Sequence, residues 1–202
     1  MDFNTSRTRE NLMRAFAGES QARNRYTFAA ETAKNNKLEV IHNIFVFTAN
    51  QELAHAKVFY DLLKENAGTT ISVDGGYPVD IYDDVIKLLR AAEHNEMEEY
   101  TDAYASFSKI AEEEGFPGIA NTFKMIANVE NIHSERFKKF ADLMEQDKLF
   151  ISDIETEWMC LNCGHSFKGT KAPGRCPICN HDQGYFIRIE LAPWSCTKNI
   201  SL

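Results

Sequence analysis

Four long stretches between residues 5 and 147 carry apolar side chains at the three- and four-residue spacing of an amphipathic helix. They run from about residue 5 to Asn35-Asn36, from there to near Gly68, from about Asp80 to Glu114, and from Pro117 to about residue 147. Proline suits the first turn of a helix, because the backbone N–H that it lacks has no partner there. No stretch alternates like a strand, so the sequence predicts four long helices.

The lengths of the connections predict how these helices are joined. The breaks at Asn35-Asn36 and at Gly115-Phe116 are short, so helices one and two should form one antiparallel hairpin and helices three and four another. Residues 67–80 are long for a turn; extended, they reach about 45 Å, the length of a helix of about 30 residues. The segment can cross the whole bundle, which predicts the single long crossover of a ferritin-like four-helix bundle.

After Asp147 the pattern changes to short β-type runs broken by Gly and Pro, such as Trp158–Cys160 and Gly184–Glu190. The chain is therefore predicted to be mainly α, with a helical domain over residues 1–150 and a small ribbon-like domain over residues 151–202. We expect the core of the bundle to be independent of the ribbon.

The charge pattern narrows the possible partners. The chain has 30 acidic residues against 22 Lys and Arg, and acids and bases are equal in number after residue 150. The formal charge of −8 therefore lies in residues 1–150, which argues against nucleic acid as a ligand. The first residues do not resemble a signal peptide, and no apolar run reaches the length of a membrane span. We expect a cytoplasmic protein that does not bind membranes.

Acidic and imidazole side chains interrupt the apolar face of every predicted helix near its middle: Glu19 in the first, Glu52 and His55 in the second, Glu96 in the third, and Glu130 and His133 in the fourth. A buried carboxylate is costly unless it is paired or binds a metal. Two metal ions bridged by carboxylates would remove that cost, and Glu-x-x-His places both ligand types on one helix face. The sequence predicts a dinuclear iron or manganese site inside the bundle.

One Glu-x-x-His is common by chance, and the alternative is a set of exposed acids on wrongly phased helices. Two such motifs, each in phase with the apolar face, favour the metal site. Spacing alone does not decide which glutamate of the third helix is the ligand, because Glu93, Glu96 and Glu99 lie close together around the centre of the face.

Other polar residues near the core have ordinary explanations. We expect surface or loop roles for the remaining histidines, His42, His94, His165 and His181. Tyr26 and Tyr104 lie on or beside the inner faces of their helices. They are either core tyrosines with a partner elsewhere or hydrogen-bond donors to a ligand carboxylate.

Cys160-x-x-Cys163 and Cys176-x-x-Cys179, separated by twelve residues, predict a tetrahedral site of four thiolates. Such a site holds zinc in a structural ribbon or iron in an electron carrier. An electron carrier fits better beside a di-iron centre, which must be re-reduced after each turnover. Cys196 lies outside the two motifs and is expected to be a spare thiol, in a tail after Pro193 that fits no pattern.

Several segments together resemble the rubrerythrin family over nearly the whole chain. They are Ala17-Gly-Glu19-Ser-Gln-Ala-Arg, Glu52-Leu-Ala-His55, Glu99-Tyr-Thr-Asp-Ala-Tyr104, Glu112-Glu-Glu-Gly115-Phe, Glu130-Asn-Ile-His133, the two cysteine motifs and Gly184-Tyr-Phe. The resemblance implies a ferritin-like bundle followed by a rubredoxin-like domain.

The resemblance also selects Glu96 and Glu99, because the family pattern has Glu-x-x-Glu directly before Tyr-Thr. It implies exchange of Glu99 and His55 on one iron as its oxidation state changes, which makes these two residues the catalytic candidates. The implied cofactors are two non-haem irons in the bundle and one iron bound by four cysteines. The implied metal ligands are Glu19, Glu52, His55, Glu96, Glu99, Glu130, His133, Cys160, Cys163, Cys176 and Cys179.

The function that the resemblance implies is that of an NADH-linked peroxidase reducing hydrogen peroxide to water. Electrons would pass from NADH through a rubredoxin-type reductase or a rubredoxin to the cysteine site, and from there to the di-iron centre. The family also implies a homodimer in which the cysteine site of one subunit lies against the bundle of its partner. The alternatives are a ferroxidase or iron-binding protein, and an electron-transfer protein or zinc-ribbon adaptor without peroxidase activity.

Overall fold

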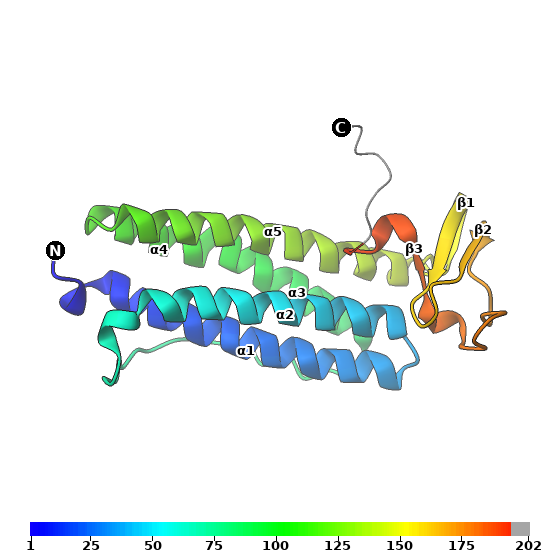
Figure 1. The fold of residues 1–202 in the computed structure, drawn as a ribbon, viewed down its shortest axis with the longest axis horizontal. Coiled ribbons are helices and arrows are strands. Elements are labelled where there is room, and N and C mark those ends of the chain that lie inside the picture. The colour runs from blue at the N-terminus through cyan, green and yellow to red at the C-terminus, as the bar shows by residue number, and fades with distance from the viewer. Residues whose placement is uncertain (195–202) are drawn as a thin grey trace.

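The computed structural model describes residues 1–194, which form a helical bundle with a small β domain at one end (Figure 1). The bundle consists of α1 (Arg7–Asn35), α2 (Glu39–Leu62), a third rod containing α3 (Val85–Glu98) and α4 (Tyr104–Glu113), and α5 (Pro117–Glu145). α1 packs on α2, and the third rod packs on α5. The predicted fold class, a ferritin-like bundle followed by a small ribbon domain, is confirmed. The predictions for Cys196 and for the tail beyond Trp194 lie outside the described residues.

Two helix ends differ from the prediction. Asp84 accepts hydrogen bonds from two free backbone N–H groups in the first turn of α3, so the helix begins directly after it and not near Asp80. α2 ends at Leu62 instead of near Gly68, because the chain tightens into a 3-10 turn soon after. Both differences lengthen the crossover segment at the expense of the helices.

The sequence predicted that the third rod is one uninterrupted helix, and this prediction is wrong. Between α3 and α4, residues Glu99–Ala103 form a π-helical turn, and the backbone N–H of Tyr104 donates to the carbonyl of Glu99, five residues earlier. Such turns insert one extra residue into a helix and often lie at functional sites. Here the turn begins at one of the predicted metal ligands.

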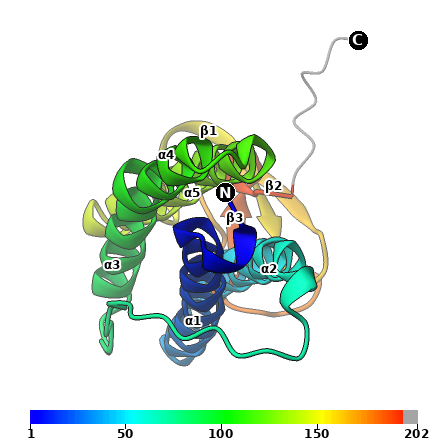
Figure 2. The ribbon, with the colours of Figure 1, turned by 90° about the vertical axis from the view of Figure 1, so that its left-hand side faces the viewer.

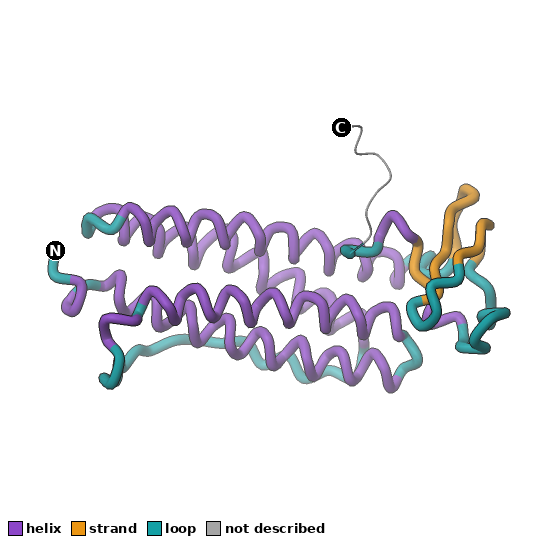
Figure 3. The backbone as a smooth tube through the Cα atoms, viewed as in Figure 1, coloured by secondary structure: helices purple, strands orange, loops and turns teal. Residues whose placement is uncertain are grey.

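The segment between α2 and α3 crosses the bundle, as its length predicted. After a short 3-10 turn (Lys64–Asn66), it follows the outer side of α1 for most of the length of that helix without further helix or strand (Figures 2 and 3). Arg14 Nη2 lies 2.8 Å from Asp74 Oδ1, and Arg25 Nη1 lies 2.8 Å from Asp80 Oδ2. These ion pairs hold the crossover against α1.

The core of the bundle consists of two apolar clusters with a polar layer between them. One cluster surrounds Phe59 and Phe123, and the other surrounds Phe45 and Phe137. On every helix, the predicted metal ligands lie between residues of the two clusters. No helix within residues 1–194 has the length and apolar character that a membrane span requires.

The C-terminal domain is built on a three-stranded antiparallel sheet in the order β2-β1-β3. β1 (Ile151–Cys160) is central and pairs with β2 (Ser166–Lys171) on one side and with β3 (Phe186–Arg188) on the other. The predicted ribbon is confirmed. The predicted run Gly184–Glu190 is a strand only over β3, with 3-10 turns on both sides, and β2 was not predicted.

The ribbon domain completes the core at one end of the bundle. Ile187 and Ala192 of the ribbon, together with Leu149 just before it, are buried in the same apolar cluster as Val40 and Phe140 of the bundle. The expectation that the bundle core is independent of the ribbon is therefore wrong: residues from after Asp147 fill the end of that core.

Gly184 of the ribbon lies directly against the bundle and provides a test of this contact. A Cβ atom at this position would lie 1.9 Å from the carbonyl oxygen of Lys37, which is backbone and cannot move aside cheaply. We expect Gly184→Ala to lower the free energy of unfolding by roughly 1–3 kcal/mol, as overpacking does. Gly174→Ala is the control, because no atom of another described residue would crowd its added Cβ within 4 Å. Urea denaturation measures both variants; equal stability would contradict the described contact.

Candidate metal centres

The polar layer brings together side chains from all four helical rods. Its buried members are less than 3% exposed, and the half-buried His55 is 12% exposed at its side chain. They are Glu19 on α1, Glu52 and His55 on α2, Glu96 on α3, and Glu130 and His133 on α5. The structure therefore assembles six of the seven ligands predicted in the bundle.

These six residues form two overlapping sets of ligand atoms, each set lying within 4.8 Å. One set consists of Glu19, Glu52, His55 and Glu130, and the other of Glu52, Glu96, Glu130 and His133. Glu52 and Glu130 belong to both sets, so each can give one oxygen to each of two ions. This is the arrangement that a carboxylate-bridged dinuclear centre requires.

The individual distances support that assignment. His55 Nδ1 lies 2.9 Å from one oxygen of Glu130 and 3.3 Å from one oxygen of Glu52. His133 Nδ1 lies 2.8 Å from the other oxygen of Glu130 and 2.8 Å from the other oxygen of Glu52. The two imidazoles thus face opposite oxygens of the same two carboxylates, and their ring centres are 5.6 Å apart.

Most of these candidate ligand atoms have no hydrogen-bond partner within residues 1–194, although they are buried. Both oxygens of Glu52 and of Glu130, one oxygen of Glu19 and of Glu96, and the Nδ1 atoms of His55 and His133 share this property. Leaving so many polar atoms unsatisfied in a core is costly unless cations bind them. The donor set of carboxylates and imidazoles suits iron or manganese. The residues therefore fit a dinuclear metal centre.

The pKa values of the cluster also indicate that its carboxylates need bound positive charge. Burial, followed by contacts with neighbouring carboxylates, raises the pKa of Glu130 well above its ordinary value. Burial acts to lower the pKa of His133, but its contacts with Glu130, Glu52 and Glu96 outweigh burial and raise the pKa to about 11. In the absence of metal, protons must supply the positive charge that the carboxylates need. Two divalent cations would replace those protons.

Two buried tyrosines hold Glu19 and Glu96, the two glutamates that belong to only one ligand set each. Tyr26 donates to Glu96 Oε1, and Tyr104 donates to Glu19 Oε1. The other oxygen of each glutamate remains free for a metal. Of the two possibilities for these tyrosines, the structure supports hydrogen bonding to ligand carboxylates.

We expect Tyr104→Phe to destabilise the metal-free protein by roughly 1–3 kcal/mol, because Glu19 Oε1 loses its donor in a buried site. Tyr60→Phe is the matched control: Tyr60 is 56% exposed, and its change should stay within about 0.5 kcal/mol. Urea denaturation after metal removal measures both. Equal stability of Tyr104→Phe and the wild type would show that the tyrosine does not support the carboxylate.

The four predicted cysteines also meet in space. Cys160 Sγ lies 3.6 Å from Cys179 Sγ, Cys163 Sγ lies 3.6 Å from Cys176 Sγ, and all four sulfurs lie within 4.8 Å of one another. They are free thiols, and their arrangement fits a single tetrahedral ion.

Two similar backbone turns present these cysteines. Gly164 and Asn180, each directly after the second cysteine of its motif, have positive φ angles of 75° and 61°. Their N–H groups donate to the carbonyls of Cys160 and Cys176. The left-handed conformation, which Gly and Asn tolerate best, closes each turn around its pair of sulfurs.

Comparison with known proteins agrees with both centres. Residues 10–141 match the family model for rubrerythrin, and residues 158–187 match the model for the rubredoxin-like domain of rubrerythrin. The chain belongs to the rubrerythrin family. The sequence is 46% identical over 183 residues to Rubrerythrin-1 of Clostridium acetobutylicum and 43% identical over 182 residues to the rubrerythrin of Clostridium perfringens. Each alignment covers 90% of this chain and 93% of the relative.

Solved structures agree as well. The fully reduced, all-ferrous state of nigerythrin is similar with a TM-score of 0.61 and 29% identity, covering 90% of this chain and 86% of that chain. This chain is therefore a rubrerythrin-type protein with a rubredoxin-like four-cysteine site and a candidate di-iron site in its bundle.

The structure distinguishes the three glutamates of the third rod that spacing alone left as alternative ligands. Glu96 is in a ligand set, whereas Glu93 Oε2 lies 2.6 Å from Arg90 Nη1 and outside both sets. Glu99 also lies outside both sets. It is half-buried, and its pKa is raised by burial first and by neighbouring carboxylates, including that of Glu19, second. Its role as a ligand stays a prediction.

Glu99 faces a pocket of about 670 Å³ between α1, the third rod and the crossover segment. Gly18, Tyr77 and Tyr104 also line it. Gly18 directly precedes Glu19 in the chain, and Tyr104 donates a hydrogen bond to Glu19. The pocket therefore ends beside the candidate dinuclear site.

The remaining histidines have structural or surface positions. His42 Nδ1 lies 3.0 Å from the carbonyl oxygen of Ala30, and the side chain of His94 is 70% exposed. His181 packs on Tyr185, with ring centres 4.4 Å apart. Among the described residues, none of these, nor His165, joins a candidate metal cluster.

Proposed function

We propose that this protein is a peroxidase that reduces hydrogen peroxide to water. Its electrons would come from NADH through a rubredoxin-type reductase, or a rubredoxin, and then through the four-cysteine site to the bundle. The observation that carries the proposal is that one chain holds a carboxylate-bridged dinuclear ligand set beside a pocket, together with a separate tetrathiolate site.

The stoichiometry suits a dinuclear centre. Reducing one hydrogen peroxide to two waters consumes two electrons and two protons. Two ferrous ions held side by side would supply both electrons together. Glu52 and Glu130, which belong to both ligand sets, would hold the two ions next to each other, and the pocket at Glu99 would admit a small substrate.

The tetrathiolate site suits electron transfer alone. Four cysteine sulfurs leave a tetrahedral ion no open position for a substrate. Zinc would fit the same sulfurs but could not change oxidation state. Iron in this site would carry one electron at a time, so two deliveries would restore the bundle after each turnover.

The layout of the chain favours electron delivery between subunits. The ribbon contacts the bundle at Lys37, just before α2, whereas Glu52 lies thirteen residues beyond Glu39, the first residue of α2, which is about 20 Å at the rise of an α-helix. A second subunit could bring its own cysteine site closer to the dinuclear centre. The proposal therefore includes a homodimer in which the cysteine site of one subunit lies against the bundle of its partner.

The free thiols of the four cysteines also suit the reducing cytoplasm, where we place the protein.

Metal analysis and a paired assay test this function. Protein from iron-replete cells should contain about three irons per chain, two for the bundle and one for the cysteines. With NADH and a rubredoxin-type reductase, hydrogen peroxide should be consumed in equal amounts with NADH. One zinc and no iron would contradict the proposal. Oxidation of added ferrous iron by oxygen, with release of ferric iron and without peroxide turnover, would favour a ferroxidase instead.

A further inference from the structure

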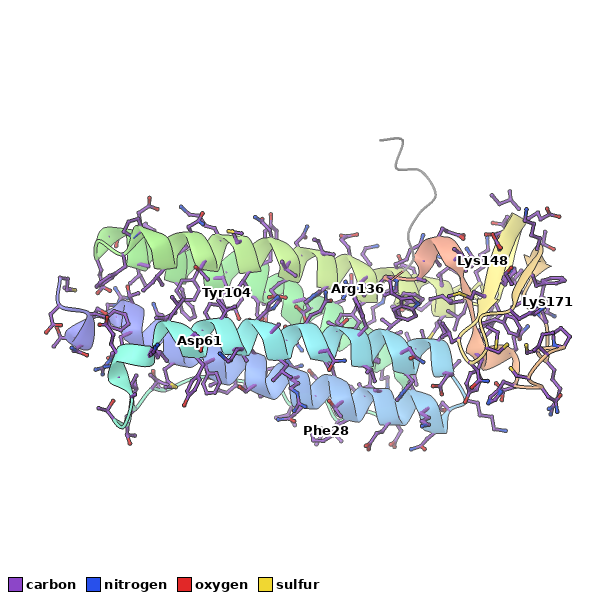
Figure 4. All side chains as sticks on the ribbon, in the orientation of Figure 1. Phe28, Asp61, Tyr104, Arg136, Lys148 and Lys171 are labelled. Carbon is purple, nitrogen blue, oxygen red and sulfur yellow. The ribbon has the colours of Figure 1, made fainter. Side chains whose placement is uncertain are left out.

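A second row of polar side chains lies behind His133, on the side away from the carboxylates. His133 Nε2 lies 3.1 Å from Gln51 Oε1. Arg136 Nη1 lies 2.9 Å from the same oxygen and 2.9 Å from Thr48 Oγ1. Arg136 belongs to α5 and the other two partners to α2, and Figure 4 shows Arg136 between these helices. The spacing of the sequence did not reveal these contacts.

The chemistry of these groups fixes the direction of every hydrogen bond in the row. A guanidinium only donates, so the Gln51 atom beside Arg136 must be the amide oxygen. An amide oxygen only accepts, so His133 must present an N–H at Nε2. When the imidazole is neutral, its lone pair is then at Nδ1, the atom that lies among Glu52, Glu96 and Glu130.

We propose that Gln51 and Arg136 are positioning residues for the dinuclear centre, because together they fix His133 with Nε2–H outward and Nδ1 toward the metal. Arg136 sets the orientation of the Gln51 amide, and the amide sets the tautomer and ring orientation of the histidine. The inference rests on the dinuclear centre of the proposed function, and it assigns these two residues a role outside the ligand set. Partners of this kind orient metal-binding histidines and increase their basicity.

Arg136 is itself held in place on several sides. Its guanidinium stacks over Phe47, with its carbon 5.1 Å from the ring centre, and Phe47 in turn packs on Trp194. Its pKa is lowered by burial, while the carboxylates of Glu52, Glu96 and Glu130 act in the opposite direction. The half-buried cation therefore lies close enough to the centre to offset part of its negative charge.

The other histidine of the centre lacks such an arrangement. His55 Nδ1 faces Glu19, Glu52 and Glu130, but within residues 1–194 no protein group accepts a hydrogen bond from its Nε2. One imidazole is thus fixed by the protein and the other is oriented from the metal side alone. The two histidines of the centre therefore differ in how they are held.

The test is metal binding by the full-length protein whose cysteine site is already filled with zinc. Gln51→Leu should weaken zinc binding in the bundle by roughly 10–100-fold, measured by competition with a chelator. Gln51→Glu keeps an acceptor for both donors and should restore most of the affinity. Arg136→Met should weaken binding and Arg136→Lys should restore it, which covers the case in which one substitution prevents folding.

Nitrogen-15 NMR of the zinc-loaded protein separates positioning from a general structural role. In the wild type and in Gln51→Glu, His133 should carry zinc at Nδ1 and a proton at Nε2. Gln51→Leu should lose that single pattern. Asn43→Leu is the control, because Asn43 is a half-buried amide on the same helix whose side chain, among the described residues, bonds to Glu39 alone. It should bind zinc like the wild type.

Two results would overturn the inference: coordination of wild-type His133 through Nε2, or wild-type affinity and NMR pattern in Gln51→Leu. Failure of the proposed function would look different. In that case the wild type would bind two ions with the expected His133 pattern, while the iron-loaded protein would not reduce peroxide.

Discussion

Full-length protein carrying Cys163→Ser and Cys179→Ser should keep its bundle iron and lose NADH-linked peroxide reduction. These two cysteines are the less buried of the four, whereas Cys160 and Cys176 are buried in the ribbon core with Trp158. Replacing the outer pair removes half of the thiolate ligands and should spare the fold. The steady-state rate should fall by at least roughly 100-fold, equivalent to about 2.7 kcal/mol in the barrier.

The same variant should still carry out one round of chemistry. After chemical reduction, its bundle should oxidise once when stoichiometric peroxide is added, followed by stopped-flow absorbance. Cys196→Ser is the control, because Cys196 lies outside both cysteine motifs, and it should behave like the wild type in both assays. Full NADH-linked turnover by the double variant would show that the cysteine site is structural, and its assignment as an electron carrier would be dropped.

A full-length variant is needed because the ribbon is part of the bundle core. Ile187 and Ala192 pack in one cluster with Val40 and Phe140. Removing the ribbon would expose that cluster, so loss of activity in a truncated chain could come from a damaged bundle. The sequence could not indicate this contact, because apolar residues in short strands look the same whether they face their own domain or a neighbouring one.

The candidate metal ligands of the bundle could be found from the sequence because polar residues stand out against an apolar helical face. Glu52 and His55 share a face with Phe45 and Phe59, and the same reasoning found Glu130 with His133. The cysteine site could be predicted because the Cys-x-x-Cys spacing is itself the geometry of the turn. In both cases a local pattern carried the information.

Most of the features that were missed depend on partners far away in the sequence. β2 is largely exposed and carries no alternation of apolar and polar residues, so only its pairing with β1 reveals it. The π-helical turn at Glu99–Ala103 differs from an α-helix by one residue, which periodicity does not resolve. Gln51 and Arg136 look like surface residues, and their role follows from contacts between α2 and α5.

The second large effect concerns the three glutamates on the third rod. We expect Glu96→Ala to lose most of the iron from the bundle. Glu96 is buried, bonds Tyr26 through one oxygen, and offers the other to the set that contains His133. Its removal takes away a ligand and leaves the tyrosine hydroxyl without its acceptor in a closed site. Iron analysis of protein from iron-replete cells measures the loss, with the cysteine iron as the internal reference.

Glu99→Ala and Glu93→Ala complete the series. Glu99 lies at the pocket and outside both ligand sets, so its removal should impair peroxide turnover while much of the iron stays bound. Glu93 pairs with Arg90, which keeps Asp142 and Glu145 as partners. Its loss should cost about 0.2–1 kcal/mol of stability and leave activity nearly unchanged, so it serves as the matched control. Loss of activity in Glu93→Ala together with a silent Glu99→Ala would show that the register assigned to the third rod is wrong.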